Sequence, residues 1–125
     1  DALYFATQGY AVTATDIVDT GLRQCEEKAK AKKLSIQFQP VDIANPLPFQ
    51  KEQFDIVYSH LGVHYLNKTG TEKLFHEIHR ILKPSGLLVS LFNSIDDPEI
   101  QLSGFEKIED HYYREIAFDF YKRYS

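Results

Sequence analysis

Two spacings of hydrophobic residues run along this chain, and each predicts one kind of element. Residues 10–15, 35–39 and 87–92 are short runs in which β-branched, aromatic or other apolar side chains recur, which is typical of strands. The run that begins at Phe54 is almost continuous in apolar residues, so it predicts a strand covered on both faces. Past its apolar part it becomes a mixed segment, with Ser, His, Gly and Tyr residues over positions 58–65.

Apolar residues spaced three and four apart predict the helices. Residues 1–8 have helical character and end at Gly9, a plausible C-terminal stop. A second helix is expected over roughly residues 21–33, capped by Asp19 or Thr20, with its inner face marked by Leu22, Cys25 and Ala29.

A third helix is predicted over residues 71–83, capped by Thr69 or Thr71 and closed by the Pro-Ser-Gly sequence at 84–86. One face of it carries the apolar side chains Leu74, Phe75, Ile78, Ile81 and Leu82. Between the strands at 35–39 and 54, the segment 41–49 holds two prolines and is predicted to be a loop.

The predicted order is helix, strand, helix, strand, loop, strand, helix, strand. This order is typical of a doubly wound, mostly parallel α/β sheet with helices on both faces. After Phe92 the pattern loosens: residues 93–99 resemble a loop, and the alternation over residues 114–121 predicts one more strand.

Composition narrows the class of protein. A chain of 125 residues with 43% hydrophobic residues has room for one domain and a modest core. The net charge of −4 and the lack of a long basic run argue against nucleic acid as a partner. No apolar stretch is long enough to span a bilayer, and a lone cysteine, Cys25, suits a reducing, cytoplasmic location. Oligomeric state stays open.

Acids that follow two successive strands are the most informative polar residues. Asp16 ends the strand at 10–15, and an acid at this place in a nucleotide-binding sheet accepts hydrogen bonds from ribose hydroxyls. Asp42 stands in the same relation to the strand at 35–39 and is followed by apolar Ile43, a pair suited to the amine and flat face of an adenine. A turn or helix-capping role is the alternative for either acid alone.

Histidines offer a second set of candidates. His60 or His64, past the strand at Phe54, could take a proton from a substrate, since histidine titrates near neutrality. The alternative, favoured for each, is that one is hydrogen-bonded at the strand end and the other is packed. His76 and His79 share a helix face, but no inward Glu or Cys joins them, so we predict a surface or packing pair and no metal site.

Four segments together resemble the successive motifs of class I S-adenosylmethionine-dependent methyltransferases, which have a Rossmann-like sheet. They are residues 9–16 (GYAVTATD), Asp42 with residues 47–49 (LPF), residues 54–57 (FDIV) and residues 81–88 (ILKPSGLL). The resemblance covers about residues 1–94, and its Leu-Lys-Pro-Ser-Gly segment is the most specific part. Residues 58–65 and 92–98 further resemble small-molecule methyltransferases of the tellurite-resistance type.

The resemblance implies a methyltransferase that uses S-adenosylmethionine and methylates a small molecule. Asp16 would hold the ribose hydroxyls, with Ile17 beside the adenine, and Asp42 with Ile43 would contact the adenine amine and ring. Ser59, His60 and Leu61 would border the methionine part and the methyl group; no catalytic residue is implied. Methyl transfer from a sulfonium needs mainly in-line positioning and a desolvated pocket.

One departure from the family leads to a further expectation. The glycine-rich loop for the amino-acid end of the cofactor is absent, as is the strand before it, which would lie between the strands ending at Asp16 and Ser59. We therefore expect residues 1–125 to form a single methyltransferase-like domain that lacks this N-terminal strand and loop. Two other functions stay open: a nicotinamide-dependent oxidoreductase, and a degenerate, cofactor-free domain that binds a partner protein.

Overall fold

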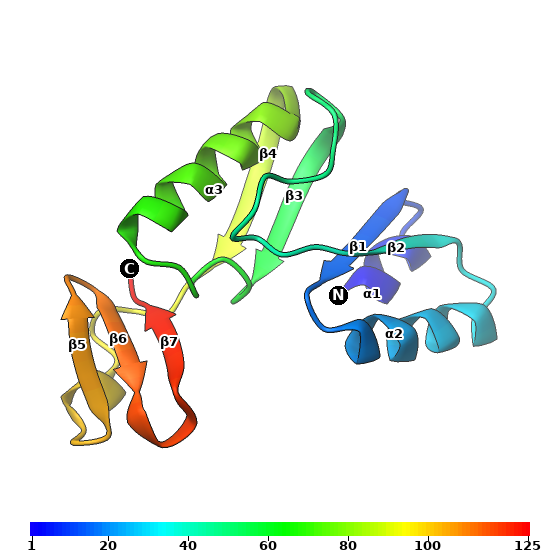
Figure 1. Ribbon diagram of the computed structural model, residues 1–125. Coiled ribbons are helices and arrows are strands. Elements are labelled where there is room, and N and C mark those ends of the chain that lie inside the picture. Colours follow the sequence, from blue (N-terminus) through cyan, green and yellow to red (C-terminus); the bar gives the residue numbers. More distant parts are fainter. The chain divides into compact units, whose positions relative to one another are not determined.

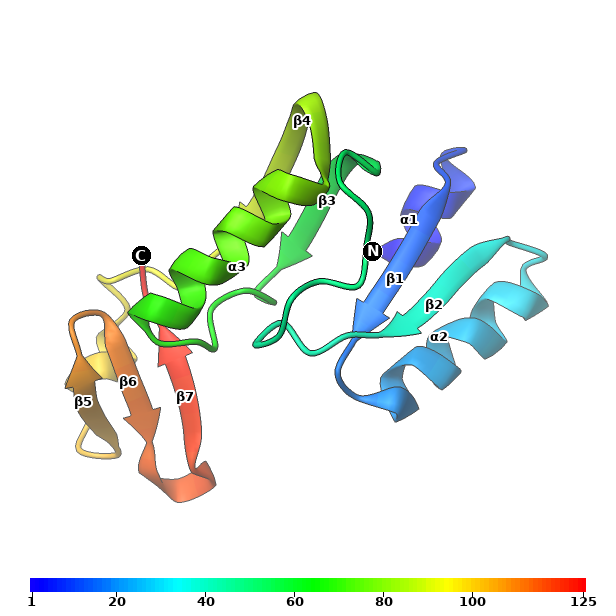
Figure 2. The same ribbon diagram turned by 45° about the horizontal axis from the view of Figure 1, so that its top comes forward.

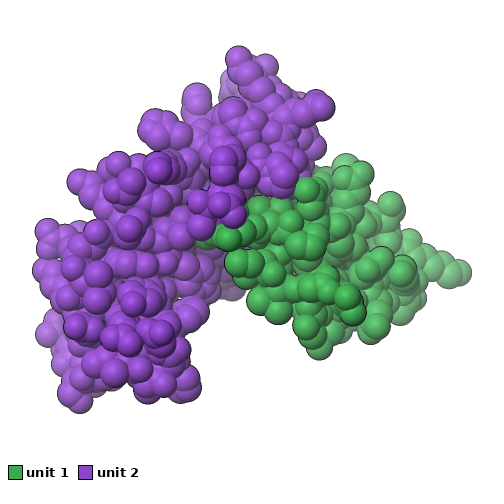
Figure 3. Space-filling view, viewed as in Figure 1, with its two compact units in different colours: residues 1–43 green, residues 44–125 purple.

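A computed structural model describes residues 1–125 and divides them into two compact units, residues 1–43 and residues 44–125 (Figure 3). The predicted order of helices and strands is confirmed as far as the fourth strand (Figure 1). In each unit, the two strands that are joined through a helix pair in parallel, as expected for such a crossover connection. No helix has the length and apolar character needed to cross a membrane.

In the first unit, a pair of parallel strands lies beside two helices (Figure 2). Its elements are α1 (Ala2–Thr7), β1 (Val12–Asp16), α2 (Asp19–Ala31) and β2 (Ile36–Pro40). Gly9 has a φ of 89°, which a residue with a side chain rarely adopts, and the predicted stop after the first helix is confirmed. On α2, Leu22 and Ala29 are buried and Cys25 is half-buried, so the predicted inner face is also confirmed.

Helix α2 starts earlier than predicted. Its N-cap residue is Val18, and no side chain caps the helix, so the prediction of Asp19 or Thr20 as the cap is wrong. The Asp19 carboxylate instead pairs with Arg23 one turn on, at 2.7 Å. The turn before the helix is held by Asp16, whose Oδ1 accepts a hydrogen bond from the Val18 N–H at 2.9 Å.

The second unit begins with a strand–helix–strand unit: β3 (Phe54–His60), α3 (Lys68–Ile81) and β4 (Leu82–Leu91). Leu74, Ile78 and Ile81 on α3 are buried. Ile56 and Tyr58, which alternate with the half-buried positions of β3, are 43% and 39% exposed. The prediction that this strand is covered on both faces is therefore wrong, because alternate side chains of a strand point to opposite faces and one set stays exposed here.

Helix α3 runs from Lys68 to Ile81, and not over residues 71–83 as predicted. Its cap is Asn67, whose side chain accepts from the Gly70 N–H at 2.9 Å, so the prediction of Thr69 or Thr71 as the cap is wrong. At the other end, Leu82 is already extended, and the chain passes directly into β4. Lys83 precedes a proline, a position that disfavours helical backbone.

A three-stranded antiparallel sheet ends the chain. Its elements are β5 (Phe105–Glu109), β6 (Tyr112–Glu115) and β7 (Phe120–Arg123), with 3₁₀ helices at Pro98–Gln101 and Ile116–Phe118. The prediction of one strand over residues 114–121 is wrong, because the second 3₁₀ helix and Asp119, at a φ of 49°, turn the chain between β6 and β7. The alternation in the sequence comes from two strands that pair with each other.

Candidate functional site

The two acids singled out from the sequence lie at the same edge of the first unit. Asp16 is the last residue of β1, and Asp42 follows β2 by two residues. In the parallel register Asp16 stands opposite Pro40, and the Val41 N–H donates to the Asp16 carbonyl at 2.9 Å. Carboxyl ends of parallel strands are where an open α/β sheet binds its ligand, and this edge carries both carboxylates.

The Asp16 carboxylate is held in a defined position by its own loop. Oδ1 accepts the Val18 N–H at 2.9 Å, a bond within the loop that follows β1. Ile17 and Val18, beside it, are 65% and 55% exposed. An oriented acceptor flanked by exposed apolar side chains can bind a hydroxyl-bearing ring system with an apolar face.

Asp42 and Ile43 differ in exposure. Asp42 is exposed and Ile43 is half-buried, while Val41 before them is buried at 6% exposure. The buried Val41 side chain anchors the chain directly after β2, so Asp42 stands at the point where the chain leaves the sheet.

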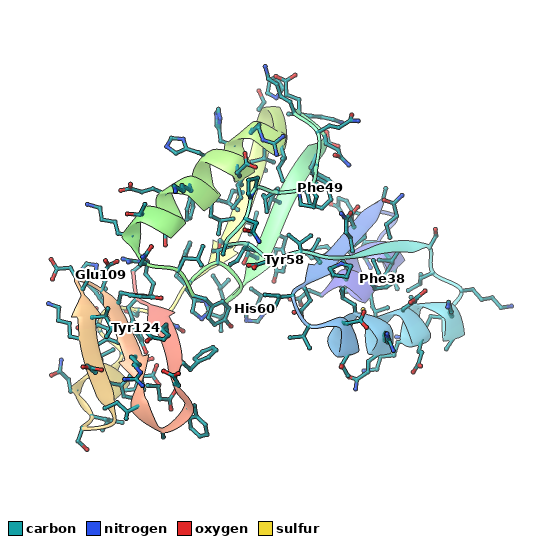
Figure 4. The ribbon with its side chains drawn as sticks, in the orientation of Figure 1. Phe38, Phe49, Tyr58, His60, Glu109 and Tyr124 are labelled. Atoms are coloured by element: carbon teal, nitrogen blue, oxygen red, sulfur yellow. The ribbon has the colours of Figure 1, made fainter.

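Ser59, His60 and Leu61 lie at the carboxyl end of β3 in the second unit, where Figure 4 labels Tyr58 and His60. The Leu61 N–H donates to the Leu91 carbonyl at 3.3 Å, and Leu61 has a φ of 54°. The Gly62 N–H donates to Ser59 Oγ at 3.1 Å. A side-chain carbon at Gly62 would approach that oxygen to 2.9 Å, so a larger residue there would displace the Ser59 hydroxyl.

His64 is the most unusual polar residue of this region. It is 4% exposed, and its Nδ1 has no hydrogen-bond partner. The Tyr65 ring lies 4.2 Å from the imidazole, centre to centre. Burial, and secondarily the positive charge of Lys122, lowers the pKa of His64, so the ring is held neutral. His64 is packed, as the alternative interpretation of the histidines predicted for one of them, whereas His60 is exposed.

The pair His76 and His79 is exposed on α3, in agreement with the surface interpretation. No group of three His, Cys, Asp or Glu side chains is close enough to hold a metal ion.

Contacts made by the C-terminal sheet were missed by sequence reasoning. Arg123, Tyr112 and Glu109 all bond to the backbone of residues 64–68, the segment that leads from the end of β3 into α3. Residue spacing carries no signal for them, because the bonded groups are 41 to 59 positions apart in the chain.

Comparison with known proteins identifies the family. The methyltransferase domain family matches residues 1–90. A phosphoethanolamine N-methyltransferase of Triticum aestivum is 31% identical over 111 residues, which is 86% of this chain and 21% of the relative.

Two solved structures share the fold. A Pyrococcus horikoshii protein is 25% identical with a TM-score of 0.74, over 94% of this chain and 56% of that one. A 1,6-didemethyltoxoflavin-N1-methyltransferase of Burkholderia thailandensis, solved with S-adenosylhomocysteine, is 20% identical with a TM-score of 0.70, over 97% and 47%. This chain thus spans about half or less of most of these relatives, and the Rossmann-like α/β fold predicted for it is confirmed.

The chain belongs to the methyltransferase domain family, and the predicted resemblance to class I S-adenosylmethionine-dependent methyltransferases is confirmed. That family and the Triticum aestivum relative are named for methyl transfer, and the Burkholderia thailandensis structure was solved with S-adenosylhomocysteine. The narrower resemblance to the tellurite-resistance type stays a prediction.

Proposed function

We propose that the protein transfers a methyl group from S-adenosylmethionine to a small molecule, and that this chain supplies cofactor-binding residues. The observation that carries the proposal is the pair of carboxylates, Asp16 and Asp42, at one edge of β1 and β2, each followed by an isoleucine. One acid–apolar pair suits the ribose and the other the adenine, because both hydroxyls and an exocyclic amine donate hydrogen bonds.

Roles follow for the seven site residues. Asp16 accepts the ribose hydroxyls, and Ile17 lies against the adenine. Asp42 accepts from the adenine amine, and Ile43 contacts the ring. The remaining three, which border the methionine part and the methyl group, are Ser59, His60 and Leu61.

The Triticum aestivum relative is named for phosphoethanolamine, which makes that small amine the first acceptor to test. In the reaction, the acceptor's lone pair attacks the methyl carbon and the sulfonium bond electrons return to sulfur, so the protein mainly holds the partners in line. We further propose that residues 1–125 belong to a single, doubly wound domain located in the cytoplasm.

Titration calorimetry tests the cofactor. The chain should bind S-adenosylhomocysteine and show no heat with NAD, which separates a methyltransferase from an oxidoreductase. Transfer of a labelled methyl group to phosphoethanolamine then tests the acceptor. If a folded preparation bound neither cofactor, the proposal would be overturned in favour of a cofactor-free interaction domain.

A further inference from the structure

The backbone that follows β3 is bonded to the C-terminal sheet at one group after another. The Arg123 N–H donates to the His64 carbonyl at 2.6 Å, and its Nε donates to the Leu66 carbonyl at 3.1 Å. One residue of β7 therefore satisfies two carbonyls of the segment that leads into α3.

Two neighbouring groups are bonded from β5 and β6. The Tyr112 hydroxyl donates to the Tyr65 carbonyl at 2.9 Å, and a Glu109 carboxylate oxygen accepts the Lys68 N–H. Groups from three different strands thus converge on five consecutive residues, 64–68. Glu109 lies at the end of β5, where Figure 4 labels it.

Arg123 connects these contacts to one another. Its guanidinium forms an ion pair with the same Glu109 oxygen and donates to the Asp110 carbonyl at 3.3 Å. The guanidinium carbon lies 5.2 Å from the centre of the Tyr112 ring. The Arg123 side chain is 12% exposed and that of Glu109 is 38% exposed, so the arginine end of the ion pair is the one shielded from water.

The bonded segment is continuous with the residues proposed to border the methyl group. From Leu61 to His64 there are three peptide bonds, and the turn between them is tight: Leu61 has positive φ, and Gly62 is bonded back to Ser59. We propose that Arg123 is a positioning residue for methyl transfer: with Glu109 and Tyr112 it holds residues 64–68, and through them the turn carrying Ser59, His60 and Leu61. This inference rests on the proposed function, since the turn matters for catalysis only if the cofactor lies beside it.

The physical reason is the sensitivity of an in-line displacement to geometry. Small misplacement of a positioning segment costs rate even when the fold survives. Lysine cannot replace Arg123, because a single ammonium cannot reproduce a planar donor set that reaches Leu66, Glu109 and Asp110 together.

Amide hydrogen exchange by NMR, with calorimetry, tests the assignment. In Arg123→Ala, the Leu61 and Gly62 N–H groups, which do not touch Arg123, should exchange about tenfold faster, as expected when the hydrogen bonds holding a segment are lost. Affinity for S-adenosylhomocysteine should fall by about the same factor, and Arg123→Lys should restore little of either.

Arg114→Ala is the matched control. Arg114 lies in the same sheet and pairs with Asp119 and Glu106, but it makes no bond to residues 64–68. It should leave both measurements unchanged. If Arg123→Ala does not fold, Tyr112→Phe removes only the hydroxyl bonded to Tyr65, with Tyr113→Phe as its control.

The outcomes separate the two proposals. If exchange at Leu61 and Gly62 is the same in Arg123→Ala as in Arg114→Ala, the positioning role is wrong. It is also wrong if exchange rises but affinity is unchanged. If the wild-type chain does not bind S-adenosylhomocysteine at all, the proposed function fails and the positioning role fails with it, whereas binding that is insensitive to Arg123 sinks the positioning role alone.

Discussion

Replacing Asp16 by asparagine is the sharpest single test of the proposed cofactor site. Alanine would remove two things at once, because the Asp16 side chain also holds the turn before α2 through the Val18 N–H. Asparagine keeps an oxygen that can accept this bond at 2.9 Å, but it removes the charge and replaces the second carboxylate oxygen with an NH2 donor. The variant therefore separates cofactor binding from local folding.

The size of the effect follows from hydrogen-bond energetics. A hydrogen bond to a charged group contributes about 1 kcal/mol more than one between neutral groups. Two ribose hydroxyls make two such bonds, so the charge is worth about 2 kcal/mol, which is about a 30-fold loss of affinity. Because Asp16 is exposed and its carboxylate is well solvated without a ligand, we take the lower end of the usual range.

Titration calorimetry with S-adenosylhomocysteine measures the loss, and thermal denaturation checks that the fold is unchanged. Asp19→Asn is the control: Asp19 lies three residues on, also carries a negative charge, and pairs only with Arg23 on the exposed side of α2. A dissociation constant for Asp16→Asn within twofold of wild type would refute the ribose assignment. An equal loss in Asp19→Asn would show that the net charge of the region, and not the ribose contact, governs affinity.

Three further changes have defined outcomes. Asp42→Asn adds a donor where only acceptors stood, so cofactor binding should weaken and calorimetry should show less discrimination between the adenine and hypoxanthine forms of S-adenosylhomocysteine; equal discrimination would count against the adenine contact. Asn67→Ala removes the α3 cap to Gly70 and should lower the free energy of unfolding by about 1 kcal/mol, measured by urea denaturation, whereas Asn67→Asp should not. Burial, the main cause, lowers the pKa of His64 from its usual 6.5, so the unfolded chain binds the proton more readily than the folded one. The free energy of unfolding should therefore be constant above pH 6.5 and decline as the pH falls below it. His64→Gln should abolish that part of the decline.

Patterns within short stretches of the sequence predicted the parts of the fold that interactions between neighbouring residues determine. Asp16 and Asp42 were placed at one edge because two strands joined by a helix run parallel, and parallel strands end on the same side. Gly9 ends α1 because its backbone conformation suits glycine. The site residues at these strand ends follow from the same reasoning and stay proposals.

Two features were not predicted from the sequence. The cap of α3 depends on a choice among several suitable residues, and the contacts of Arg123 depend on partners far away in the chain. Asn67, Thr69 and Thr71 are all good capping residues, and only the geometry shows that Asn67 reaches the Gly70 N–H while Thr71 bonds back to carbonyls. The bonds of Arg123 to His64 and Leu66 join positions far apart in the chain, and no periodicity records such pairs.

The segment between β3 and α3 is a loop by its sequence, yet hydrogen bonds hold its backbone at its start, in its middle and at its end. At its start, Leu61 bonds to β4 and Gly62 to Ser59. In its middle the carbonyls of residues 64–66 accept from β6 and β7, and at its end Asn67 caps α3. A segment bonded at its start, its middle and its end has fewer alternative conformations of similar energy than a free loop. Residues bordering a transferred methyl group benefit from this rigidity, because the protein can then contribute to the reaction by geometry without supplying a base.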